Sequence, residues 1–280
     1  MTSWARGFNR ATCTMPYTNP AAYEQFMGRW SSRLAPVFIR FAGVRNGQRV
    51  LDVGCGTGSL SRQLLASGRA IHVVGVDPTA SYLAFARETI PAAHGQFRLG
   101  AAEALPFANE TFDVALSLLV LQDITDLDRA LLEMARVTRR GGTVAACQWD
   151  FVGGLPMLSL FWLAADAVAP QAVARHQESN PKLSQQRASL HELAKLWTAS
   201  GLEEVRTATL ELSMTFGSFD DYWRPFLGGA TPTSTFAAAI NEETGGALAR
   251  ALRDKITDVQ PDGSFVLPAR AWALAGAPTH

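Results

Sequence analysis

Short apolar runs alternate with amphipathic segments through the first half of the chain. The apolar runs predict strands at 49–53, 71–76, 96–99, 112–120 and 143–149. The segments between them predict helices at 59–67, 79–90 and 126–138. Strands this apolar, separated by helices, are typical of a parallel sheet that is covered on both faces.

The pattern differs on both sides of this alternation. Residues 17–42 carry apolar side chains at spacings of three and four, which predicts a helix that Pro36 kinks or ends. After residue 149 come a helix at 190–199 and strands at 204–214 and 264–274, separated by two aromatic-rich segments, 150–189 and 217–261. We expect one domain over residues 1–280, in which 17–42 is a lid helix and both segments cap a substrate pocket.

Three glycines follow the first predicted strand, in the stretch VLDVGCGTGSL at 50–60. A loop of this kind lets a ligand approach the backbone, and Asp77 ends the next strand, where a carboxylate can bind a ribose diol. Nicotinamide dinucleotides and adenosyl compounds both have that diol. The third glycine comes one place too early for a dinucleotide loop, and the Asp52 carboxylate would repel a pyrophosphate. These features favour the cationic S-adenosylmethionine over a nicotinamide cofactor or a turn without a ligand.

Five stretches in order along the chain resemble the class I S-adenosylmethionine-dependent methyltransferases, in particular the branch that includes the ubiquinone and menaquinone C-methyltransferases. They are LDVGCGTG (51–58), VGVDPT (74–79), GAAEALPF (100–107), FDVALSLLVLQDITD (112–126) and EMARVTRRGG (133–142). The resemblance implies an α/β, Rossmann-like, doubly wound sheet of seven strands that is mostly parallel. Its last strand would be antiparallel, with helices on both faces and helical lid insertions.

The resemblance also implies roles at the cofactor site. Asp52 would face the amino group of the methionyl part, and Asp77 would bind the ribose hydroxyls. Arg29 could bind the cofactor carboxylate, although a solvated arginine explains it equally well. The other implied cofactor contacts are Gly54, Cys55 and Gly56 around the methionyl part, Pro78, Ala102 and Glu103 near the adenine, and the Leu118 backbone near the ammonium. Ala101 stands where the family often has an Asp that receives an adenine hydrogen.

Two candidate catalytic residues, Gln122 and Asp123, follow the fourth predicted strand. Many relatives have His here, which can act as a base, whereas Gln cannot take a proton at neutral pH. Asp123 could serve instead, although an Asp beside a helix is more often a cap or a surface group. A protein that binds S-adenosylmethionine without transferring its methyl group is therefore the alternative to a methyltransferase.

The aromatic residues of the two insertions predict a small substrate that is partly apolar or aromatic. A second small core explains the same residues equally well. His176, a lone histidine in the first insertion, is more often a packed residue than a base. The candidate pocket residues are Trp149, Phe151, Phe161, Trp162, Tyr222 and Trp223.

The composition of the chain disfavours several classes of binding partner. The 280 residues contain 25 Lys plus Arg and 25 Asp plus Glu, so there is no basic excess of the kind that binds nucleic acid. Cys13, Cys55 and Cys147 lack metal-site spacing, so we expect no metal, reduced thiols and a cytoplasmic location. The start, MTSWARGFNR, lacks the apolar region of a signal peptide, and 155–170 is too short to span a membrane, so no membrane partner is expected.

Overall fold

The computed structural model describes residues 19–69, 71–179 and 188–279. Three features of the sequence lie outside these ranges: Cys13, the first two positions of the predicted helix 17–42, and residues 180–187 of the first insertion.

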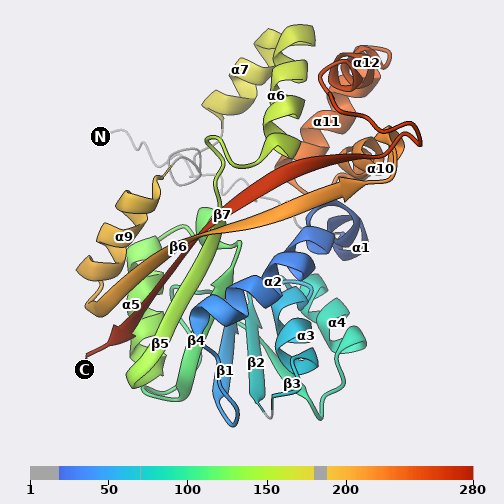
Figure 1. The fold of residues 1–280 in the computed structure, drawn as a ribbon. Coiled ribbons are helices and arrows are strands. Elements are labelled where there is room, and N and C mark those ends of the chain that lie inside the picture. The colour runs from blue at the N-terminus through green and yellow to red at the C-terminus, as the bar shows by residue number, and fades with distance from the viewer. Residues whose placement is uncertain (1–18, 70, 180–187, 280) are drawn as a thin grey trace, which may run out of the picture.

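Seven strands form one sheet in the order β3-β2-β1-β4-β5-β7-β6 (Figure 1). Strands β1 to β5 pair in parallel, and β7 runs antiparallel to both β5 and β6. This arrangement confirms the predicted fold class. The strands are β1 (Arg49–Val53), β2 (His72–Asp77), β3 (Gly95–Leu99), β4 (Phe112–Leu118), β5 (Thr138–Trp149), β6 (Leu202–Phe216) and β7 (Phe265–Pro278).

Helices cover both faces of the sheet. On one face, α2 (Arg29–Ala42) and α3 (Ser59–Ala66) bury apolar side chains against it, and α4 (Ala80–Thr89) packs beside β2 and β3. On the other face lie α5 (Leu127–Val137) and α9 (Leu190–Ala199). Side chains cap both of these helices, because Asp126 accepts from the Arg129 amide and Ser189 forms a capping box with Glu192.

The N-terminal helix is interrupted, but not where its proline predicts. It consists of α1 (Pro20–Tyr23), a π-helical turn η1 (Glu24–Gly28) and α2, which continues through Pro36 to Ala42. The prediction that Pro36 could end the helix is wrong. Leu34, Ala35 and Phe38 around it are fully buried against the sheet, and this burial holds the helix together across the hydrogen bond that proline cannot make.

The two insertions gather at the end of the sheet where the parallel strands have their carboxyl ends (Figure 1). Strands β6 and β7 extend past the other strands toward them. We call the helices of the insertions the cap helices. They are α6 (Pro156–Val168), α7 (Pro170–Glu178), α10 (Phe219–Trp223) with the 3₁₀ turn η3 (Arg224–Gly228), α11 (Pro232–Glu243) and α12 (Ala247–Arg253).

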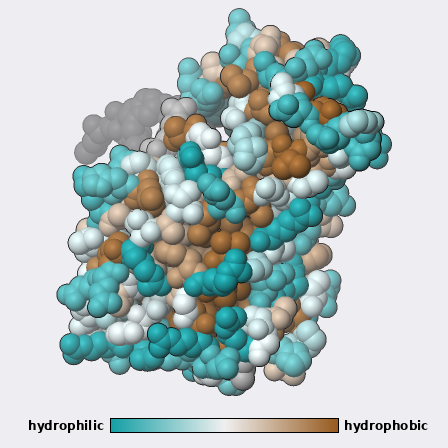
Figure 2. All heavy atoms as spheres, viewed as in Figure 1, coloured by the Kyte–Doolittle hydropathy of each residue, from teal (hydrophilic) through white to brown (hydrophobic). Residues whose placement is uncertain are grey.

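Apolar residues reach the surface in places. Figure 2 shows them where β6 and β7 cross the sheet and among the cap helices. Val152, Leu163 and Val266 are examples of large exposed apolar side chains. Across 19–69, 71–179 and 188–279, none of the helices combines the length and the apolar character that a membrane span requires.

A buried carboxylate fastens the end of β5 to β7. Asp150 accepts from Arg270 Nε at 2.9 Å and from the amides of Val152 and Gly153 at 3.1 and 3.2 Å. Its side chain is 2% exposed, whereas that of Arg270 is 46% exposed. This contact holds the start of the first insertion on the sheet.

We therefore expect Asp150→Ala to lower the free energy of unfolding by about 1–3 kcal/mol, because two amides lose a buried acceptor while Arg270 can still reach water. Thermal and urea denaturation would measure this loss. Asp220→Ala is the matched control, since its pair with Arg224 is exposed on both sides and should contribute little. Equal losses in the two variants would contradict the assignment.

Candidate functional site

The residues after β1 form a tight loop against the end of β2. The amides of Gly54 and Cys55 both donate to Val76 O, at 2.8 and 3.0 Å. Gly54, Gly56 and Gly58 have φ angles of 70°, 51° and 88°, in the left-handed region that favours glycine. A Cβ at Gly54 would lie 2.5 Å from Val120 Cγ1. The loop therefore needs glycine both for its backbone angles and for its close approach to the segment after β4.

Asp77, at the end of β2, ties the middle of this loop to the sheet. Its carboxylate accepts from the Gly56 amide at 2.9 Å and from the Thr79 amide at 2.8 Å. The side chain is buried, and burial raises the pKa of Asp77, with a further contribution from the nearby Asp123 carboxylate. The structure thus brings Asp77 and the glycine loop into direct contact, as the sequence led us to expect.

Asp52 lies beneath the loop. It is 1% exposed, and its carboxylate accepts from the amide and the hydroxyl of Ser61 in α3, at 3.1 and 2.7 Å. Burial raises the pKa of Asp52 to about 7. The Asp52 carboxyl is thus buried and hydrogen-bonded to α3, so its charge is weaker at neutral pH than the sequence argument against a pyrophosphate required. Contact between Asp52 and a bound amino group stays a prediction.

The N-terminal helix is fastened onto the glycine loop. Glu24, the first residue of η1, accepts from Thr57 Oγ1 at 2.5 Å and from Arg62 Nη2 at 3.2 Å. The rings of Tyr23 and Tyr82 lie 5.4 Å apart beside this contact. Sequence reasoning missed these residues, because nothing in the helical spacing of 17–42 indicates that a π-helical turn directs Glu24 to the loop.

Arg29 points to the second insertion. Its guanidinium donates to Asp221 Oδ1 at 2.6 Å and to the Asp221 carbonyl at 3.0 Å, and it lies 4.5 Å from the centre of the Trp30 ring. The guanidinium thus already has a carboxylate partner within the chain. The predicted contact with a cofactor carboxylate would require that pair to break.

The segment after β4 contains a strained residue. Leu119 has a φ of 63°, which is rare for a bulky side chain and recurs at functional sites. Its amide donates to Cys147 O at 2.7 Å. In the following 3₁₀ turn, η2 (Leu121–Asp123), Gln122 Nε2 donates to Leu119 O at 2.7 Å. The sequence predicts a strand through this position, so it missed the turn.

The remaining predicted cofactor residues lie around the same strand ends. Glu103 accepts from the amides of Thr125 and Asp126 at 3.0 and 3.4 Å, so its carboxylate holds the start of α5. Ala102 and Leu118 are buried, and Pro78 is exposed directly after Asp77.

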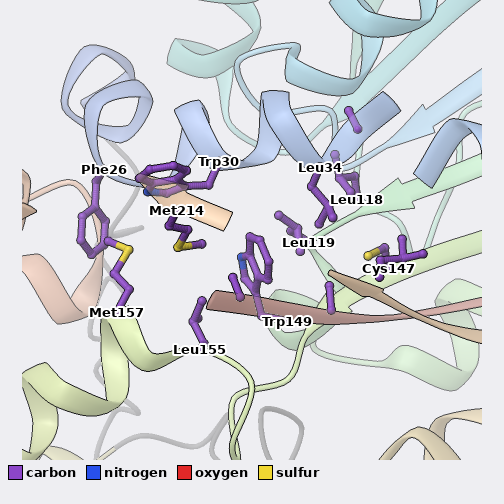
Figure 3. Close-up of a cluster of buried hydrophobic side chains, with 14 of the residues drawn as sticks. Phe26, Trp30, Leu34, Leu118, Leu119, Cys147, Trp149, Leu155, Met157 and Met214 are labelled. Carbon is purple, nitrogen blue, oxygen red and sulfur yellow. The ribbon is translucent and has the colours of Figure 1, made fainter. Parts of the chain in front are cut away.

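Most of the predicted pocket aromatics are core residues. Trp149, Phe161, Tyr222 and Trp223 are buried, and Tyr222 donates to Met157 O at 2.7 Å. Figure 3 shows Trp149 with Trp30, Leu118, Leu119 and Met214 between α2 and the strand ends. Phe151 and Trp162 are partly buried against the same cluster. These aromatic residues thus pack in the same apolar cluster as the sheet and not in a separate small core, and their contact with a substrate stays a prediction.

His176, the remaining candidate base, packs against aromatic rings of the insertions. His176 stacks on Trp162, with ring centres 5.1 Å apart, and burial lowers its pKa, as expected for a packed histidine. Within the described ranges no group of three or more His, Cys, Asp or Glu side chains is arranged to hold a metal.

Comparison with known proteins gives this geometry a context. Residues 51–146 match the family described as a methyltransferase domain. The malonyl-[acyl-carrier protein] O-methyltransferase of Erwinia billingiae is 38% identical over 166 residues, which are 59% of this chain and 61% of that protein. Residues 51–146 thus form a methyltransferase domain of the S-adenosylmethionine-dependent kind. The match spans less than two thirds of the length of the Erwinia relative.

Two solved structures share the fold of this chain. The YcgJ protein of Bacillus subtilis aligns with a TM-score of 0.58 at 18% identity, over 89% of this chain and 99% of that one. The phosphoethanolamine N-methyltransferase 2 of Haemonchus contortus, solved with S-adenosyl-L-methionine, aligns with a TM-score of 0.57 at 18% identity, over 96% of this chain and 59% of that one.

The burial of Asp52 makes the stability of the methyltransferase domain depend on pH. A carboxyl whose pKa is about 7 when folded and near 4 when unfolded holds its proton more tightly in the folded state. Stability should therefore fall as pH rises from about 4 to 7, by up to about 4 kcal/mol from this group. Asp52→Asn should remove that component, so the variant should be more stable than the wild type by up to about 4 kcal/mol at pH 8 and by about a third of that at pH 5. Urea denaturation at both pH values measures this, and parallel pH profiles would contradict it.

Proposed function

We propose that this protein binds S-adenosylmethionine at the glycine loop and transfers its methyl group to a small, partly apolar or aromatic metabolite. The observation that carries the proposal is the contact between the loop and Asp77, at the carboxyl ends of β1 and β2, where ligands of parallel sheets bind. We also propose that the partner is a small molecule and not a nucleic acid, since the charges balance.

The chemistry of the site fits this cofactor. Glycine lets a ligand approach the loop backbone closely. Burial raises the pKa of Tyr82, and the nearby carboxylates of Asp77, Glu24 and Asp123 raise it further. Such surroundings favour a cation over a pyrophosphate. When bound, S-adenosylmethionine supplies a methyl group on a positively charged sulfur. Asp77 would hold the ribose. The backbone of Gly54 to Gly56, whose amides already donate to Val76 O and Asp77, would lie along the methionyl part.

The protein's own part in the reaction would be positioning and the exclusion of water. The Glu24 contact would keep the N-terminal helix over the loop, and Leu118, Leu119 and Trp149 would keep the strand ends dry. Positioning of this kind can lower a barrier by roughly 7–11 kcal/mol. Gln122 cannot take a proton, so a general base in this turn would have to be Asp123.

Two other candidates remain. The similarity to the malonyl-[acyl-carrier protein] O-methyltransferase favours a malonyl thioester as substrate, with its carboxylate as the methyl acceptor. A protein that binds the cofactor without transferring the methyl group is the other candidate. Incubation with S-adenosylmethionine and a panel of phenols, amines and malonyl thioesters separates all three, because S-adenosylhomocysteine forms only with an accepted substrate.

The glycine loop gives a direct binding test. Gly54→Ala should weaken S-adenosylhomocysteine at least about tenfold in calorimetry, because the new Cβ would collide with Val120 and displace the loop. Gly47→Ala is the matched control: its φ of 77° causes the same backbone strain, but no atom lies within 4 Å of the added Cβ. Unchanged affinity in Gly54→Ala would exclude the loop from the site.

Asp77 gives a second test, of the ribose contact. Asp77→Ala should weaken S-adenosylhomocysteine about 10- to 100-fold, the range expected for lost hydrogen bonds to a charged group. NADH should not bind the wild type. Binding of NADH with no binding of S-adenosylhomocysteine would overturn the proposed function.

A further inference from the structure

The side-chain amide of Gln122 is held in one orientation. Its nitrogen donates to Leu119 O at 2.7 Å and to Asp123 Oδ2 at 3.1 Å. Both partners can only accept a hydrogen bond, so the nitrogen has to face them and the oxygen has to face away. The Oε1 atom is buried and has no hydrogen-bond partner in the part of the chain that the structure describes.

A buried amide oxygen without a donor is costly. It loses about 1–3 kcal/mol of solvation, and native proteins usually satisfy such atoms with protein, water or a ligand. Gln122 itself is 8% exposed, so bulk water does not readily replace the missing donor. The strained Leu119 that Gln122 holds is a second unusual feature of the same turn. Together they make Oε1 an acceptor that the described residues leave unused.

The position of the turn indicates which molecule. It directly follows β4, and Val120 packs on Gly54 of the glycine loop, so Gln122 borders the proposed cofactor site. The methyl acceptor has to meet the cofactor at this edge of the sheet. We propose that Gln122 Oε1 accepts a hydrogen bond from the methyl-accepting group of the substrate, a hydroxyl or an amine that still carries its hydrogen. This inference rests on the proposed function.

The charges around the turn disfavour a carboxylate acceptor. Asp123 lies beside Gln122, and its charge acts on the nearby Asp77. Two arginines near the loop are already paired, Arg29 with Asp221 and Arg62 with Glu24. A carboxylate would bring no hydrogen for Oε1 and would be repelled by both aspartates. The substrate would then differ in chemistry from the malonyl group in the name of the Erwinia relative.

Glutamine suits this role for a physical reason. An amide oxygen can hold and orient a hydroxyl or an amine, but it cannot remove the proton at neutral pH. Gln122 would therefore direct the lone pair of the acceptor without acting as a base. Its role would be binding and specificity.

Three probes test the inference without knowledge of the substrate. Sinefungin carries an amine where S-adenosylmethionine carries the transferable methyl group, S-adenosylhomocysteine has neither, and 5′-methylthioadenosine lacks the amino-acid part. The amine of sinefungin can donate to Oε1. Calorimetry on the full chain would give the affinity of each probe for the wild type, Gln122→Met, Gln122→Glu and the exposed control Gln171→Met on α7.

We expect Gln122→Met to lower the affinity for sinefungin about tenfold or more relative to S-adenosylhomocysteine, because a charged donor loses its acceptor. Gln122→Glu, which keeps an acceptor oxygen, should preserve or raise this ratio, and Gln171→Met should leave it unchanged. The measured quantity is the ratio of the affinities for sinefungin and S-adenosylhomocysteine. A distortion of the Leu119 turn that weakens both ligands equally would leave this ratio unchanged.

Two results would overturn the inference. One is an unchanged ratio in Gln122→Met while S-adenosylhomocysteine still binds. The other is an equal loss for sinefungin and S-adenosylhomocysteine with 5′-methylthioadenosine unaffected, which would place Oε1 at the methionyl amino group. Failure of the wild type to bind S-adenosylhomocysteine would instead overturn the proposed function.

Discussion

The hydrogen bonds between the glycine loop and the end of β2 are the constraint on which the rest of the site depends. Two loop amides share Val76 O, and Asp77 accepts from the middle of the loop. These contacts hold three glycines in left-handed conformations and press Gly54 against Val120. Because Val120 directly precedes η2, the same contacts place Gln122 and Asp123 beside the loop. A change in the loop would therefore move both halves of the candidate site together.

Around this centre, polar contacts join parts of the chain that are far apart in sequence. Glu24 links the N-terminal helix to the loop, and Arg29 links it to the second insertion through Asp221. The apolar cluster of Figure 3 contains side chains from α2, β4, β5 and β6. The N-terminal helix is thus packed into the same core as the sheet and the cap helices. Opening the site to a ligand would mean breaking side-chain contacts as well as moving a helix.

Much of the fold could be predicted from the sequence, because each local pattern agrees with the tertiary structure. The strand at 49–53 and the helix at 190–199 have their predicted bounds, and the other predicted strands and helices of the sheet are present with small shifts at their ends. Proline did not predict the end of a helix: Pro36 lies inside α2, because burial of its neighbours outweighs the loss of the backbone hydrogen bond that proline cannot make. The glycine loop and Asp77 were predicted as parts of one site, because the carboxyl ends of adjacent parallel strands meet at one edge.

The sequence by itself determined the order of strands and helices, the parallel sheet and the place of the glycine loop, since these follow from hydrophobic periodicity and from glycine. Only the tertiary structure decided what the polar side chains do. Asp52 is buried on Ser61, Arg29 is paired with Asp221, and the Gln122 amide is held by Leu119 and Asp123. Such a hydrogen bond forms only when the side chains are positioned to within about a few tenths of an ångström. Periodicity carries no information about such distances, so the chemistry of the site had to come from the folded chain.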